Sequence, residues 1–182
     1  FTLIELMVVV AIIALIATAG APRMRTYFSN SASNSTQQRL FINLMQARNH
    51  AITRQMPVTI APNDTTTGNG VLATGGGVNW GLGWKTFIDA NNNGKYDSGD
   101  TNEILLGSQD DFGDNIQIRS IAGTLDSSKP IIFEATGRAR NVGTLSIGAF
   151  GCIGQHSHSI QINTIGQTIS TKIDCPTEFL DK

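Results

Sequence analysis

Residues 1–21 read FTLIELMVVVAIIALIATAGA, and residues 22–25, which follow them, read PRMR. Glu5 is the only charged residue before Arg23, so the apolar run is almost uninterrupted. About 20 apolar residues at about 1.5 Å each match the hydrocarbon thickness of a bilayer. The sequence therefore predicts a membrane-spanning helix over residues 1–25. Because the chain begins with Phe and no basic region precedes the run, we expect an upstream segment to have been removed.

Glu5 is the unusual residue of this helix. A carboxylate near the bilayer interior costs about 3 kcal/mol on insertion scales, so such residues are generally functional and paired. An α-amino group in a bundle of identical helices is one partner that fits. Alternatively, Glu5 lies shallow among the headgroups, where its charge costs little. The residues by themselves leave both readings open.

The first six residues, FTLIEL, resemble the mature N-terminus of type IV pilins and type II secretion pseudopilins. The resemblance implies that a prepilin peptidase cuts before Phe1, that the new amine is methylated, and that Glu5 neutralises the amine of a neighbouring subunit during assembly. Pro22, which the family pattern shares, lacks a backbone N–H and should kink or melt the helix near residues 17–21. The resemblance also implies that this stretch can lose helicity within a filament.

An amphipathic continuation of the helix is predicted over residues 26–55. Apolar residues recur there at helical spacing, as Leu40, Leu44, Ala47 and Ala51. The polar residues 29–36 are poor helix formers, so we expect a solvent-washed helical neck, with a short break as the alternative. Pro57 cannot continue the helix and should end it near Gln55.

From residue 56 to 182 the sequence predicts a β-rich head domain. Eight short segments alternate with Gly, Asn, Asp and Ser turns, namely 58–60, 84–88, 103–106, 116–118, 130–133, 144–147, 159–162 and 168–173. Trp80, Trp84 and Phe87 are expected core residues. The predicted fold class is α+β, with a long N-terminal α-helix packed on a C-terminal antiparallel β-sheet domain, as in type IV pilins.

Three stretches of the head domain are similar to the GspH/FimT/FimU group of minor pilins. They are GLGWKTFIDANNNGKYDSGDTNEILL at 81–106, IIFEATGRARNVGTLSI at 131–147 and SIQINTIGQTIST at 159–171. Residues 62–79 have no counterpart in the group, and we expect a Gly/Thr-rich loop there.

The segment from residue 89 to 100, DANNNGKYDSGD, is similar to a calcium-binding loop. Gly occupies its sixth position and oxygen-bearing side chains its first, third, fifth, ninth and twelfth, namely Asp89, Asn91, Asn93, Asp97 and Asp100. The strand-like flanks, the neutral Asn side chains and an Asp in place of the final Glu favour the alternative, an Asn/Gly-rich turn between strands. The sequence suggests no cofactor other than calcium, and calcium only through this loop.

Arg138 and Arg140 lie in a Gly-Arg-Ala-Arg element that resembles one used by DNA-binding pilins in natural transformation. Two arginines make about two phosphate contacts, too few for firm binding at physiological salt, and the net charge of the chain is −1. A solvated turn is the favoured interpretation, and DNA is not a favoured partner.

Two further pairs of residues are candidates for sites. Cys152 and Cys175 are the only cysteines, and in an exported protein such a pair usually forms a disulfide, with two buried free thiols as the alternative. His156 and His158 would face the same side of a strand, but no third metal ligand accompanies them, so we expect surface residues.

The sequence as a whole predicts a structural subunit, minor or major, of a type IV pilus or related filament. It would reside in the inner membrane before assembly and then in a periplasmic or cell-surface filament with other pilin subunits. The alternatives are a DNA-binding pilin and a minor pseudopilin of type II secretion. Nothing resembles a nucleophile–base pair, a phosphate loop or a carboxylate acid/base pair, so we expect no enzymatic activity.

Overall fold

The structure, a computed structural model, describes residues 2–63, 80–110, 112, 115–125 and 129–176, without the side chains of residues 17–23. The loop expected at 62–79 therefore lies outside the described residues from position 64 onward. Phe1 and the side chain of Pro22, two of the predicted assembly residues, also lie outside them.

The helix α1 runs unbroken from Leu3 to Arg54 over 52 residues. This confirms that helix continues through the polar stretch 29–36. The backbone is helical through residues 17–22, so the local melting expected before Pro22 does not occur in this structure, and the loss of helicity within a filament stays a prediction. Gln55 ends the helix in a left-handed conformation with φ 58°, two residues before Pro57.

The described residues form nine strands in two antiparallel sheets. The first sheet has the order β3-β2-β1-β5-β6, with β1 Val58–Pro62, β2 Trp84–Ile88, β3 Ile104–Gln109, β5 Ile131–Phe133 and β6 Ala139–Arg140. The second has the order β4-β7-β8-β9, with β4 Ile116–Gly123, β7 Gly143–Ala149, β8 Ser157–Ile162 and β9 Thr168–Ile173. A short 3₁₀ helix, η1, covers Trp80–Leu82.

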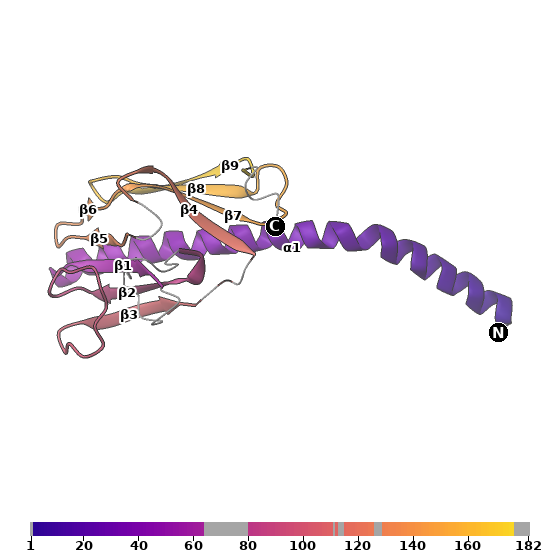
Figure 1. The fold of residues 1–182 in the computed structure, drawn as a ribbon, viewed down its shortest axis with the longest axis horizontal. Coiled ribbons are helices and arrows are strands. Elements are labelled where there is room, and N and C mark those ends of the chain that lie inside the picture. The colour runs from indigo at the N-terminus through magenta and orange to yellow at the C-terminus, as the bar shows by residue number, and fades with distance from the viewer. Residues whose placement is uncertain (1, 64–79, 111, 113–114, 126–128, 177–182) are drawn as a thin grey trace.

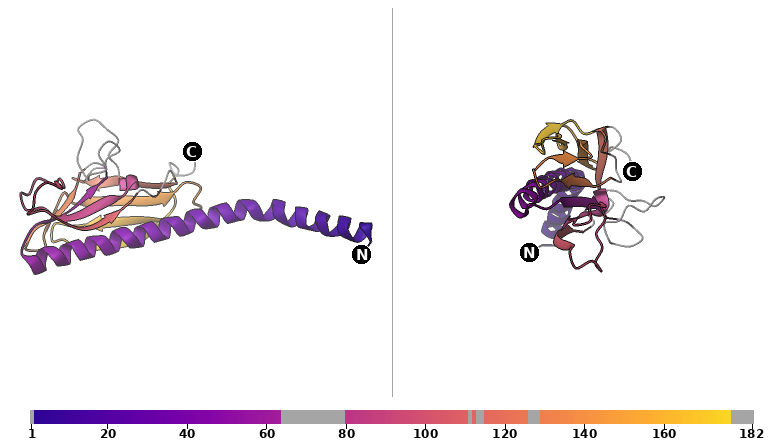
Figure 2. Two further views of the ribbon diagram at one scale, coloured as in Figure 1. Left: turned by 90° about the horizontal axis from the view of Figure 1, so that it is seen from below. Right: turned by 90° about the vertical axis from the view of Figure 1, so that its left-hand side faces the viewer.

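All eight predicted strands are present, which confirms the α+β class. β6 was missed because two residues are too few to show an alternating pattern. Both sheets lie along the C-terminal part of α1, and its N-terminal part projects beyond them and bends away (Figure 1). Seen from below, the sheets cover the same side of α1 (Figure 2, left).

One hydrophobic core joins α1 to both sheets. The predicted helical stripe is fully buried in it, together with residues of β1, β2, β5, β7 and β8. Trp80, Trp84 and Phe87 are fully buried, as predicted. The helix is therefore the shared support on which the two sheets are held.

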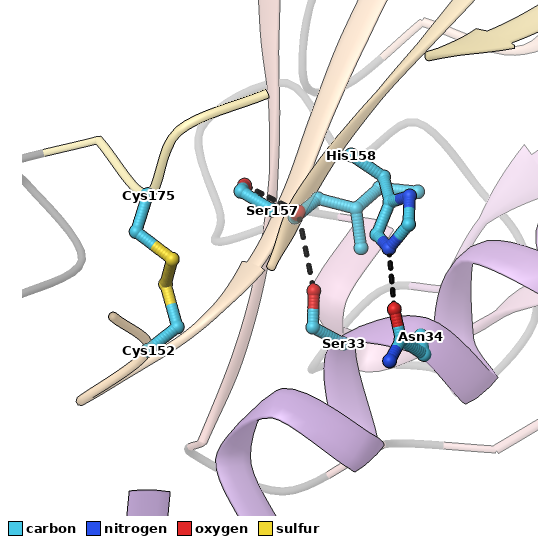
Figure 3. The surroundings of a disulfide bond; sticks show 7 residues. Ser33, Asn34, Cys152, Ser157, His158 and Cys175 are labelled. Atoms are coloured by element: carbon cyan, nitrogen blue, oxygen red, sulfur yellow. Dashed lines mark hydrogen bonds between the residues drawn. A yellow bond between two sulfur atoms is a disulfide. The ribbon is translucent and has the colours of Figure 1, made fainter. Parts of the chain in front are cut away.

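Only one side of the polar neck of α1 is open to solvent, with Ser31 and Ser35 exposed, which corrects the expectation of a neck washed all round. Ser33 and Thr36 are buried, and Ser33 Oγ donates to the carbonyl oxygen of Ile147 on β7 at 3.5 Å (Figure 3). Small side chains let the helix approach the second sheet closely. Residues that are weak helix formers in isolation thus serve as packing residues.

His158 also departs from its expected place at the surface. Its side chain on β8 is buried, and Nε2 lies 2.6 Å from Oδ1 of Asn34 in the neck (Figure 3). A carbonyl oxygen only accepts hydrogen bonds, so the Nε2–H tautomer donates here. Burial lowers the pKa of His158, and the positive charge of Lys172 and the neighbouring His156 lower it further.

We expect the protein to lose stability in mild acid because of His158. Above its ordinary pKa near 6.5 the imidazole is neutral in both states and has no effect. As pH falls below that value, the unfolded chain takes up the proton before the folded chain does, so the free energy of unfolding falls. Urea unfolding at pH 7.5 and 5.5 should show a smaller loss for His158→Gln than for the wild type. His50→Gln is the control, and an equal loss in all three proteins would exclude His158 as the cause.

Cys152 and Cys175 form a disulfide, which confirms the predicted pair. It joins the turn after β7 to the segment after β9 across 23 residues, with 6.0 Å between the Cα atoms (Figure 3). Cys152 is fully buried. The bond holds the end of the described chain against the second sheet.

Candidate functional site

The N-terminal part of α1 exposes its apolar side chains all round. Each of the following is at least 51 % exposed: Leu3, Ile4, Leu6, Met7, Val8, Val9, Val10, Ile12, Ile13, Leu15 and Ile16. We call residues 3–16 the projecting segment. A helix that is apolar on every face is typical of a membrane or of the interior of an assembly, and monomers rarely expose a patch of this kind.

Within the part of the chain that the structure describes, no helix qualifies as a membrane span by length and apolar character. The predicted span, residues 1–25, includes the stretch 17–23, whose side chains are outside the description.

Glu5 lies at the free tip of the projecting segment, where it caps its own helix. Its Oε2 accepts the backbone N–H of Thr2 at 2.9 Å, and Thr2 Oγ1 accepts the backbone N–H of Glu5 at 3.4 Å. This reciprocal capping box satisfies two backbone donors, and it places the carboxylate at the positive end of the helix dipole. The sequence signal for this box is the Thr-x-x-Glu pattern of residues 2–5.

The two arginines considered for DNA binding lie around the β5–β6 turn. Arg138 is exposed. Arg140 forms an ion pair with Glu134, with 2.7 Å between Nε and Oε1, and contacts Oδ1 of Asn92 at 3.3 Å. Part of the positive charge is therefore already matched within the head domain.

The candidate calcium loop joins β2 to β3, and the side chain of its first residue, Asp89, accepts the hydrogen bonds that hold the loop. Asp89 is buried, and its carboxylate accepts hydrogen bonds from the hydroxyl of Thr59 at 2.8 Å, from N–H of Asn93 at 3.0 Å and from N–H of Gly94 at 2.8 Å. Gly94 has φ 76°, a conformation that glycine adopts without strain. These contacts bend the chain sharply around Asp89.

The other predicted oxygen ligands each accept a hydrogen bond from the loop's own backbone. The acceptors are Oδ1 of Asn91, Asn93, Asp97 and Asp100. Throughout the described chain, no group of three or more His, Cys, Asp and Glu side chains gathers as a metal site. The hydrogen bonds hold these side-chain oxygens in place, and those of Asn91 and Asn93 are neutral amide oxygens.

Glu103, just before β3, is a buried residue that the sequence pattern missed. Its side chain is 6 % exposed, and Oε2 accepts N–H of Asp97 at 2.7 Å. Oε1 is buried without a hydrogen-bond partner among the described residues. Burial raises the pKa of Glu103, the Asp97 hydrogen bond opposes this, and the charges of Asp89, Asp100 and Asp97 raise it further. In the sequence, the only sign of this residue is that an acidic side chain follows Asp100 by three positions.

A long apolar helix that projects from an antiparallel β-domain defines the class of pilin-like proteins. A model of the family described as type II transport protein GspH matches residues 36–166, well over half of the chain. The chain therefore belongs to the GspH family, and it is a pilin-like structural subunit.

The solved structures that are similar to this chain include a minor pilin and a minor pseudopilin. The type IV minor pilin FimU of Pseudomonas aeruginosa is 14 % identical, with 79 % of this chain and 90 % of that chain covered and a TM-score of 0.49. The minor pseudopilin EpsH of the type 2 secretion system of Vibrio cholerae is 12 % identical, with 77 % and 96 % covered and a TM-score of 0.46. Among curated proteins no match was found.

Proposed function

We propose that this protein is built into a type IV pilus-like filament by the projecting segment, which packs among the corresponding helices of other subunits. The observation that carries the proposal is the exposure of every large apolar side chain from Leu3 to Ile16. Full burial of one such side chain is worth about 1.5–3 kcal/mol, so the segment is strongly driven out of water. The head domain then forms the outer surface of the filament.

The same apolar surface fits a bilayer before assembly, which supports an inner-membrane stage. Lipid tails are as apolar as Leu, so transfer of the helix from lipid into a filament gains little hydrophobic free energy. Packing and polar contacts must therefore select the neighbour. Glu5 at the helix tip is suited to this role, as the partner of a neighbouring subunit's N-terminal amine. Processing by a prepilin peptidase and methylation of that amine belong to the same proposal.

The description of the matching family favours a second candidate, a minor pseudopilin of a type II secretion filament. Such a subunit would use the same helix in the same way, in a periplasmic filament. DNA receptor activity has less support, because Arg140 is paired with Glu134. The proposal assigns no enzymatic activity to the protein.

A charge placed on the projecting segment tests the proposed assembly. Val9→Asp should lower the share of subunit found in sheared filaments by about a hundredfold, because a carboxylate packed among neighbouring helices without a partner costs about 3 kcal/mol and each tenfold corresponds to 1.4 kcal/mol. Ile121→Asp on β4 is the matched control, since Val9 and Ile121 are 53 % and 59 % exposed. The share is measured by quantitative mass spectrometry, with the cell-associated protein as reference. Equal incorporation of the two variants would refute assembly through α1.

A further inference from the structure

The β2–β3 loop presents more oxygens than its fold requires. Residues 89–95 turn around the side chains at the first, third and fifth positions, because the N–H groups of Asn93, Gly94 and Lys95 point back to Asp89, Asn91 and Asn93. Oδ1 of each of these three residues has a further lone pair that a cation can use, whereas Oδ2 of Asp89 already accepts from both Thr59 and Gly94. In calcium loops these positions, the backbone carbonyl of the seventh residue and the ninth side chain supply ligands, and glycine is sixth.

Glu103 is an independent indication of a ligand. Its side chain is 6 % exposed, and Oε1 is buried without a hydrogen-bond partner in the described structure. Burial of a charged oxygen without a partner costs free energy. Its other oxygen is held by N–H of Asp97, at the ninth position of the loop. The negative charges of Asp89, Asp97 and Asp100 act on it. A bound cation would satisfy the free oxygen and offset this repulsion.

We propose that the β2–β3 loop binds a calcium ion, with Glu103 as the carboxylate that completes the site. The other ligands are the side chains of Asp89, Asn91, Asn93 and Asp97 and the carbonyl oxygen of Lys95. Among the described residues these three carboxylates do not already gather as a metal site, so binding requires Asp89, Asp97 and Glu103 to draw together around the ion. Asp100, the twelfth residue of the loop, instead accepts N–H of Asn102 at 2.9 Å and caps the next turn.

The oxygen set favours calcium over magnesium. Calcium takes six to eight oxygens, including neutral ones, in flexible geometry, whereas magnesium demands a small octahedron and keeps several waters. Three carboxylates also give the site a charge that suits a divalent cation. Because the ion would tie β2 to β3, its removal should loosen the edge of the first sheet while α1 stays unchanged.

Calcium binding is tested on the full chain in detergent after treatment with EDTA. Tb³⁺ luminescence sensitised through Tyr96, the eighth residue of the loop, should rise on titration, and Ca²⁺ should reverse it. Ca²⁺ at a hundredfold excess over Kd should raise Tm by about 5–10 °C. Absence of both signals in the wild type, or an equal rise of Tm with Mg²⁺, would overturn the assignment.

Two substitutions within the loop identify the last ligand. Glu103→Gln keeps an oxygen for N–H of Asp97 and should weaken Ca²⁺ binding at least about tenfold, as loss of a charged ligand does. Asp100→Asn should change the affinity less than about threefold, and Asp174→Asn, on the exposed segment beyond β9, should leave it unchanged. Wild-type affinity of Glu103→Gln, or a larger loss in Asp100→Asn, would overturn the role of Glu103. Far-UV circular dichroism of each variant shows that it is folded.

Discussion

Glu5→Gln is expected to lower incorporation into filaments by about ten- to a hundredfold. A hydrogen bond to a charged group contributes about 1.5–3 kcal/mol, and each 1.4 kcal/mol is a factor of ten. The amide of Gln still accepts the N–H of Thr2, so the cap of α1 is kept while the negative charge is lost. The measurement is the share of subunit in sheared filaments, as for Val9→Asp.

A second substitution separates the two roles of Glu5. Thr2→Ala removes the hydroxyl half of the capping box at a cost of about 1 kcal/mol, but it keeps the carboxylate. If Glu5 acts by charge pairing with a neighbouring amine, Thr2→Ala should assemble far better than Glu5→Gln. The reverse order would mean that Glu5 matters only as a helix cap, and charge pairing between subunits would be wrong.

Leu44→Ala is expected to destabilise the head domain by about 2–5 kcal/mol. Leu44 is fully buried in the core that α1 shares with both sheets, and truncation there removes apolar contacts and leaves a cavity. For a chain of this size the corresponding fall in Tm is about 5–15 °C. The buried Trp80 and Trp84 make tryptophan fluorescence a direct measure of unfolding.

The matched control lies two residues away on the same helix. Ile42 is about half exposed, so Ile42→Ala should change the free energy of unfolding by no more than about 0.5 kcal/mol. If Leu44→Ala were equally mild, α1 would not support the two sheets, and the head domain would be stable without it.

Patterns that act over a few residues predicted most of the fold. The spacing of Leu40, Leu44, Ala47 and Ala51 marks one face of a helix, and a proline shortly afterwards ends it. Alternating apolar residues marked eight strands, and the FTLIEL start indicated the family. For the calcium loop, the spacing of oxygen side chains located the segment but did not reveal Glu103, since its importance comes from burial after β3 pairs with β2.

The chain alone thus determined a long apolar helix, its end, the antiparallel β-domain and the position of Glu5. Tertiary structure decided which polar residues are buried. Ser33 bonds to Ile147 across 114 positions and Asn34 to His158 across 124, so no local pattern contains those contacts. The physical reason is that propensity and periodicity depend on near neighbours, whereas desolvation of a hydroxyl, an imidazole or a carboxylate depends on which distant strand packs over it.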